Sequence, residues 1–136
     1  MLDCIFCKIV AGEIPCVKIW EDENFLAILD VLPAIKGQTL VVSKHHMSSD
    51  IFVLWDEEYC GLLVAAKKVV AVLKKWLQVE RVGMVVEWME VDHAHVKLYP
   101  FWWGKSFVWW FAGKEMSSSE QLQKVANEID SKFKNS

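Results

Sequence analysis

The residues best suited to chemistry are concentrated in segment 91–100, where His93, His95, Lys97 and Tyr99 alternate with apolar side chains. Successive side chains of a β-strand point to opposite faces, so these four residues would share one face and the apolar ones the other. Imidazole can act as a base, an acid, a metal ligand or a nucleophile near neutral pH. The pattern predicts a strand with one face in the core and one carrying a reactive site. The alternative is a half-buried strand whose polar side chains are simply solvated.

The elements that would position this segment follow from hydrophobic periodicity. A short helix capped by Asp3 is expected first, and a Ser-x-x-Glu/Gln capping box opens the last helix. The long helix has apolar side chains on two faces, which predicts the core on one side and a second subunit on the other. We expect helices over 4–11, 57–77 and 117–133 and strands over 17–20, 25–29, 38–43, 81–88 and 91–99. A tight link would join strands 81–88 and 91–99, and a strand-like segment covers 106–111.

Length and charge limit the classes of function. A chain of 136 residues predicts one domain, 1–136, with 116–136 as a C-terminal helix. A net charge of -3 without a basic run argues against a nucleic-acid polymer as partner. No apolar stretch approaches the roughly 20 residues that span a bilayer, and the first residues lack a signal-peptide pattern. We therefore expect a cytoplasmic protein that does not enter a membrane.

Five short motifs carry a resemblance to a known family. They are DCIFCKIVAGEIP at 3–15, ED at 21–22, LD at 29–30, KGQTLVV at 36–42 and HAH at 93–95. In this order, over residues 3 to about 111, the chain resembles the histidine triad (HIT) family of nucleotide hydrolases and transferases. The resemblance implies an α+β fold: a five-stranded antiparallel meander with one long helix, a short N-terminal helix and a C-terminal helix. It also implies a homodimer formed through the long helix and a sheet edge.

The resemblance further implies attack by His95 on the α-phosphate of a purine nucleotide or nucleotide conjugate. The product would be a covalent nucleotidyl-histidine that water or an acceptor resolves. His93 and Lys97 flank His95 and could stabilise phosphoryl charge. Lys97 stands where the family has a third histidine, and an ammonium is a poor proton shuttle near neutrality. Met89 and Trp88 replace a polar and a small residue, so slow hydrolysis or transfer fits these residues as well as fast hydrolysis does.

The same resemblance assigns a nucleoside pocket and a metal site. Asp30 would accept hydrogen bonds from the ribose hydroxyls, and an apolar set would surround the base: Ile5, Phe6, Ile9 and Ile28. Ordinary core packing is the alternative for these four residues. A structural zinc ion would be bound by Cys4, Cys7, His46 and His93, a tetrahedral Cys2His2 set. A redox Cys-x-x-Cys pair or two buried thiols are the alternatives.

The chain has eight tryptophans, and two pairs of them are adjacent. Adjacent side chains of an extended segment cannot both enter one core. This suggests an engineered variant with aromatic residues added to a natural scaffold, or a natural protein with an aromatic dimer surface. It also supports a second hypothesis for function: a catalytically weak or inactive scaffold that serves in binding or self-assembly through its tryptophan-rich surfaces.

Overall fold

The computed structural model describes residues 3–87, 89–102 and 118–134. One five-stranded antiparallel sheet forms the centre, in the order β1-β2-β3-β5-β4. The elements in chain order are α1 (Ile5–Val10), β1 (Lys18–Glu21), β2 (Phe25–Leu29), β3 (Thr39–Ser43), the 3-10 turn η1 (Ile51–Val53), α2 (Asp56–Leu77), β4 (Arg81–Val85), β5 (His95–Phe101) and α3 (Ser119–Lys134). The predicted α+β fold with a five-stranded antiparallel sheet, a short first helix and a long central helix is confirmed.

The strand register sorts the side chains of β5 onto two faces. Val96 pairs with Val41 of β3, while His95 and Lys97 pair with Val42 and Leu40. Residues paired across an antiparallel ladder point to the same side of the sheet. The predicted separation of His95 and Lys97 from the apolar residues of this strand is therefore confirmed.

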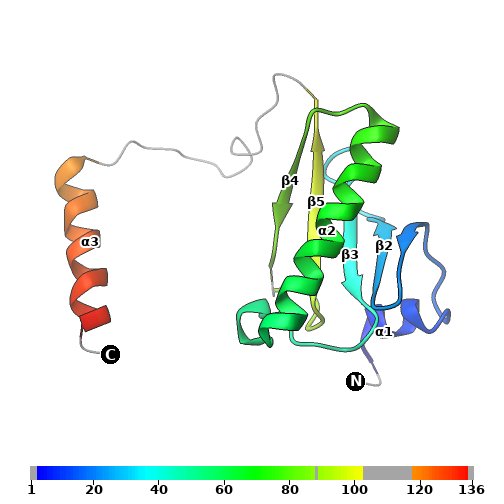
Figure 1. The fold of residues 1–136 in the computed structure, drawn as a ribbon, viewed down its shortest axis with the longest axis horizontal. Helices are drawn as coiled ribbons and strands as arrows, with labels where there is room; N and C mark the ends of the chain where they lie inside the picture. Colours follow the sequence, from blue (N-terminus) through cyan, green and yellow to red (C-terminus); the bar gives the residue numbers. More distant parts are fainter. Residues whose placement is uncertain (1–2, 88, 103–117, 135–136) are drawn as a thin grey trace.

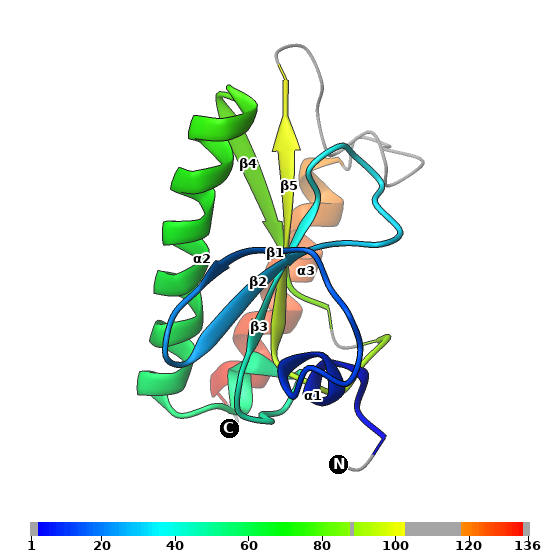
Figure 2. The ribbon, with the colours of Figure 1, turned by 90° about the vertical axis from the view of Figure 1, so that its right-hand side faces the viewer.

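Each face of the sheet has its own apolar cluster. One face packs against α2, whose buried residues are Leu62, Ala65, Ala66, Val69 and Leu73. The other face is covered by α1, and its cluster consists of Phe6, Leu26, Ile28, Leu40 and Val42. Figure 2 shows the sheet between α2 and α1. The reactive residues of β5 thus belong to the α1 side.

The two ends of the long helix carry charged side chains of opposite sign. Its first turn carries Asp56, Glu57 and Glu58 and its last turn Lys74 and Lys75, which complements the helix dipole. The helix ends at Leu77, and its C-cap residue, Gln78, has the left-handed backbone conformation.

Several expected boundaries are wrong. The N-cap of α1 is Cys4, while Asp3 instead pairs with Lys8. Strand β5 begins at His95, so His93 lies in the bend before the strand and not on its face. β4 ends at Val85, and the connection to β5 covers residues 86–94 instead of forming a tight link.

The last helix begins with the predicted capping box. The backbone N–H of Ser118 donates to the Gln121 side chain, and the backbone N–H of Gln121 donates to Ser118 Oγ. Figure 1 shows α3 standing apart from the sheet. Among the described residues, no helix is long and apolar enough to cross a membrane.

The tryptophans divide between surface and half-buried positions. Trp55 and Trp76 are exposed, and Trp20 and Trp102 are half-buried. The other four, at 88, 103, 109 and 110, lie outside the described residues, as does the strand expected over 106–111. The hypothesis of an engineered aromatic surface stays a prediction.

Candidate functional site

The predicted nucleophile, His95, has a defined tautomer. Its Nδ1 lies 2.7 Å from the carbonyl oxygen of His93. Because a carbonyl can only accept, Nδ1 carries the proton, and in the neutral ring Nε2 holds a lone pair. His95 is 2% exposed, and the centroid of its ring lies 5.1 Å from the centroid of the Phe6 ring. In the neutral ring, Nε2 is therefore the nitrogen with nucleophilic capacity.

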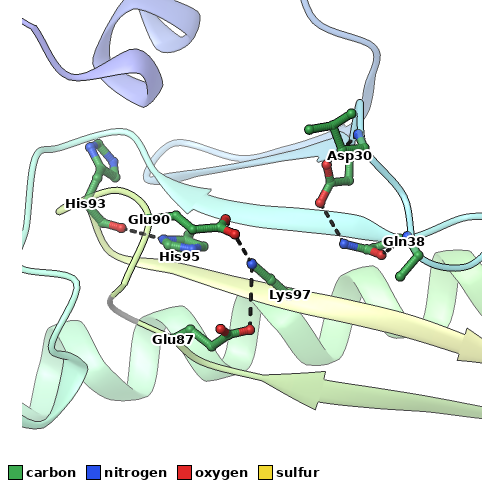
Figure 3. Close-up of polar contacts among 9 residues, drawn as sticks. Asp30, Gln38, Glu87, Glu90, His93, His95 and Lys97 are labelled. Carbon is green, nitrogen blue, oxygen red and sulfur yellow. Dashed lines mark hydrogen bonds and ion pairs between the residues drawn. The ribbon is translucent and has the colours of Figure 1, made fainter. Parts of the chain in front are cut away.

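Lys97 is a buried cation with two acidic partners. Its Nζ lies 3.1 Å from Glu90 Oε2 and 3.6 Å from Glu87 Oε1, both in or next to the connection between β4 and β5 (Figure 3). Burial lowers the pKa of Lys97, but the hydrogen bond to Glu90 and the charges of both carboxylates outweigh it, so the pKa is raised above its ordinary value of 10.5. Lys97 is therefore a permanent cation at neutral pH.

Cys4, Cys7, His46 and His93 come together as the sequence predicts. Their ligand atoms all lie within 4.8 Å of one another. The His93 Nδ1 is 3.3 Å from Cys4 Sγ and 3.5 Å from Cys7 Sγ, and His46 Nδ1 is 3.4 Å from Cys7 Sγ. A tetrahedral ion with bonds of 2.0–2.3 Å separates its ligands by roughly 3.3–3.8 Å. The donor types and spacing of these four residues fit a metal ion.

The contacts of His93 with Ser43 determine which ring nitrogen faces the cysteines. Its Nε2 donates to the Ser43 carbonyl oxygen at 2.7 Å and lies 3.1 Å from Ser43 Oγ. The lone pair of a neutral ring is then at Nδ1, on the side of the two sulfurs. Burial lowers the pKa of His93 below its ordinary value of 6.5, despite the hydrogen bond to the Ser43 backbone. The ring is therefore neutral at pH 7.

Four supporting residues were missed from the sequence: Ser43, Ser49, Glu90 and Asp92. Asp92 Oδ1 accepts from both the backbone N–H and the hydroxyl of Ser49, each at 3.0 Å. These hydrogen bonds lower the pKa of Asp92 and tie the bend before β5 to the loop after His46. Ser43 and Glu90 act through contacts with His93 and Lys97. These contacts join distant parts of the chain, and no local motif marks them.

The apolar residues expected around the base are brought only partly together. Phe6 and Ile28 are buried in the cluster on the α1 face, and Ile9 packs against it. Ile5 is 46% exposed and lies outside that cluster. Instead, it borders a cavity of about 470 Å³ that is also lined by Cys4, His46, Glu90 and Val91.

Asp30 lies at the end of β2 and already has partners. Its two oxygens accept from the backbone N–H of Leu32 at 2.9 Å and from Gln38 Nε2 at 2.7 Å. Gln38 in turn accepts from the backbone N–H of Ala34 at 2.6 Å. Figure 3 shows Asp30 and Gln38 at the ends of the loop between β2 and β3, bonded to each other. Ribose binding by Asp30 stays a prediction.

Comparisons with known proteins agree with this architecture. Residues 11–99 match the HIT domain family. The adenosine 5'-monophosphoramidase hnt1 of Schizosaccharomyces pombe is 34% identical over 98% of this chain and 100% of its own length. The crystal structure of SMU.412c from Streptococcus mutans UA159 is 31% identical, with a TM-score of 0.77 over 98% of this chain and 87% of that chain.

A further similar structure contains a metal ion. It is a Zn-bound histidine triad family protein from Mycobacterium smegmatis, 28% identical, with a TM-score of 0.68 over 96% of this chain and 97% of that chain. The matched domain covers most of the chain, and the similarity covers 100%, 87% and 97% of the three relatives' own lengths. The chain belongs to the HIT family.

Proposed function

We propose that this chain is a nucleotide-conjugate hydrolase or nucleotidyl transferase that acts at the α-phosphate through His95. The observation that carries the proposal is the 2.7 Å contact between His95 Nδ1 and the His93 carbonyl oxygen. It leaves Nε2 as the unprotonated nitrogen, as a nucleophile requires. A relative with similarity over its whole length is named as a phosphoramidase, which supports a nucleotide amidate as substrate.

The proposed reaction has two displacements at phosphorus. In the first, a bond from His95 Nε2 to phosphorus forms as the bond to the leaving group breaks. The leaving group takes the bonding electron pair and acquires a proton from solvent. In the second, water or another acceptor attacks phosphorus, loses a proton, and His95 departs with its electron pair. Lys97, as a permanent cation, stabilises the charge on the phosphoryl oxygens in both steps.

The nucleoside part of the substrate has proposed contacts on the α1 face. Phe6, Ile9 and Ile28 supply apolar surface for a purine base, and Ile5 borders the cavity beside them. Asp30 would accept from the ribose hydroxyls with the lone pairs that Leu32 and Gln38 leave available.

Substitution of His95 tests the proposed activity. Turnover of adenosine 5'-phosphoramidate by His95→Ala should fall at least about 1,000-fold, because the nucleophile is lost. Exposed His45 provides the matched control, and His45→Ala should keep wild-type turnover. Equal turnover by His95→Ala and wild type would refute the mechanism.

We also propose that the Cys2His2 cluster holds a structural zinc ion. Zinc would tie α1, through Cys4 and Cys7, to the loops that carry His46 and His93. Metal analysis should find about one zinc per chain, and a chelator should lower the unfolding temperature. Cys7→Ser should remove both effects, whereas Cys60→Ser at an exposed site should keep them. Metal-free protein with an unchanged unfolding temperature would refute this site.

We further propose a homodimer formed through α2 and the neighbouring edge of the sheet. Val64 is 50% exposed on the side of α2 opposite its buried residues, and Trp76 is 74% exposed near the end of the helix, where it borders a cavity with Ile19 and Leu29. Light scattering after gel filtration should give the mass of two chains. Trp76→Glu should shift the protein toward the mass of one chain.

A further inference from the structure

The ammonium expected to meet phosphate is already bonded to carboxylates. Lys97 Nζ donates to Glu90 Oε2 at 3.1 Å and forms an ion pair with Glu87 Oε1 at 3.6 Å. Figure 3 shows both glutamates converging on this one nitrogen. An incoming phosphate would therefore meet two carboxylates of like charge at the one cation, and these anions repel one another.

Neither of the groups assigned to phosphate is accessible in this arrangement. His95 is 2% exposed and Lys97 8% exposed. A phosphoryl group that contacts both must therefore displace a side chain that now covers them. Among the described residues, the side chains that bond Lys97 and can also move into solvent are Glu87 and Glu90.

Glu90 meets both conditions better than Glu87. The Glu90 side chain is 71% exposed, and the residue lies in a bend that borders two cavities of about 470 and 590 Å³. The Glu87 side chain is 40% exposed and lies two residues after the end of β4. Because the Glu90 carboxylate is mostly in solvent, its ion pair contributes little to stability, and its loss costs little when a phosphoryl group forms a charge-assisted bond to the same ammonium.

We propose that Glu90 competes with the nucleotide phosphate for Lys97. Its carboxylate bonds the ammonium in the free protein, gives way to phosphate in the complex and returns when the product leaves. Glu87 stays paired with Lys97 and keeps the ammonium in position. Glu90 thereby weakens ground-state binding of anionic ligands and favours product release. This inference rests on the proposed nucleotide function.

Calorimetric titration of AMP and adenosine into full-length variants tests the competition. Glu90→Gln keeps the size of the side chain but removes its charge, so it should bind AMP about 5-fold more tightly, the equivalent of one exposed ion pair. Adenosine lacks the phosphate and should bind wild type and Glu90→Gln equally. Glu87→Gln should give a smaller gain for AMP, and Glu23→Gln, at an exposed turn, should give none.

A double-mutant cycle tests whether Glu90 affects AMP binding through Lys97. In a Lys97→Met background, Glu90→Gln should improve AMP binding less than about 2-fold, because the shared partner is gone. An equal gain in both backgrounds would overturn the proposal. So would unchanged AMP affinity in Glu90→Gln, a parallel gain for adenosine, or a gain in Glu87→Gln as large as that in Glu90→Gln.

The outcomes separate this inference from the proposed function. If His95→Ala is inactive but Glu90→Gln binds AMP no more tightly than wild type does, the activity stands and the competition fails. If Glu90→Gln shows the phosphate-specific gain while His95→Ala retains turnover, the competition stands and the mechanism fails. Absence of AMP binding in wild type and in Glu90→Gln overturns both.

Discussion

A single backbone contact defines the chemistry available to His95. The carbonyl oxygen of His93 fixes the proton on Nδ1, and His93 itself is fixed by the Ser43 carbonyl oxygen. The two histidines thus have opposite tautomers, one with its lone pair at Nε2 and the other at Nδ1. At the scale of residues, two imidazoles of one motif thus present different nitrogens, as the proposed attack on phosphorus and the proposed metal ligation each require.

The cation at position 97 leads to a prediction for the rate. Lys97→Met should lower kcat/KM for adenosine 5'-phosphoramidate about 100-fold or more, the loss typical of one donor to a developing oxyanion. Steady-state kinetics at pH 7 measures this, and Lys67→Met on the exposed side of α2 is the control. A fall of less than about 3-fold would favour the hypothesis that the fold is retained as a weakly active scaffold.

At the scale of elements, the connections between strands determine the site more than the strands do. The loop from Asp30 to Gln38 is closed by a backbone hydrogen bond of 3.0 Å between its ends. The connection from β4 to β5 supplies Glu87, Glu90 and His93. Both loops are attached to a sheet whose register is set by its two apolar clusters.

Gly37 in the first of these loops should be sensitive to substitution. Its φ is +81°, and a Cβ there would collide with the Leu77 side chain and lie 3.3 Å from Pro100. Gly12 has a φ of +79° with no atom near the added Cβ. Gly12→Ala should cost about 1–2 kcal/mol from strain alone, and Gly37→Ala roughly 1–3 kcal/mol more from overpacking. Urea unfolding measures both, and equal losses would contradict the packing argument.

Glu21 at the end of β1 predicts a pH dependence of stability. Hydrogen bonds from Lys18 and from Lys44, the latter 2.7 Å away, lower the pKa of Glu21 from 4.5 to about 2. A lowered pKa stabilises the fold above the unfolded value, and this stabilisation is lost as the pH falls from 4.5 to about 2. Wild type should therefore unfold at a higher temperature than Glu21→Gln at pH 7, and the difference should vanish near pH 2.

Thermal unfolding from pH 7 to pH 2 measures this effect. Glu23 lies in the exposed turn that follows β1, and Glu23→Gln also removes one negative charge, so it serves as the control. It should show no comparable change with pH. A difference between wild type and Glu21→Gln that stayed constant down to pH 2 would rule out this ion-pair cluster as its source.

At the scale of the whole molecule, the sheet separates a large apolar cluster on the α2 side from the candidate site on the α1 side. The α2 side is a large apolar cluster, whereas the α1 side combines a smaller cluster with His95, Lys97 and the Cys2His2 group. The α1 side adds buried polar groups, which need partners to be tolerated. No buried side-chain nitrogen or oxygen within the described residues is left without a hydrogen-bond partner.

The α2 cluster should dominate the free energy of unfolding. Leu62 is fully buried in it, so Leu62→Ala should destabilise the protein by about 2–5 kcal/mol. Leu32 is 85% exposed, so the same substitution there should change stability by less than about 0.5 kcal/mol. Chemical denaturation gives both values. Similar losses at the two positions would show that the core has been placed wrongly.

The sequence alone predicted the three helices, the five strands of the sheet and the two faces of α2 and β5, although it misplaced the end of β4 and the start of β5. The three-four spacing of α2 and the alternation in β5 are local patterns, and hydrophobic burial imposes them wherever the segment packs. The resemblance to the HIT family also predicted that Cys4, Cys7, His46 and His93 come together, and their ligand atoms do lie within 4.8 Å of one another.

The tertiary structure decided which partners complete the site. Ser43 meets His93, Ser49 meets Asp92, and Glu90 meets Lys97 through loops whose paths depend on packing between distant segments. The strand pattern placed His93 on β5, but the structure places it before that strand, where it can face the cysteines. Local periodicity determines the secondary structure of a segment, whereas contacts between distant residues are fixed only when the two apolar clusters close on the sheet.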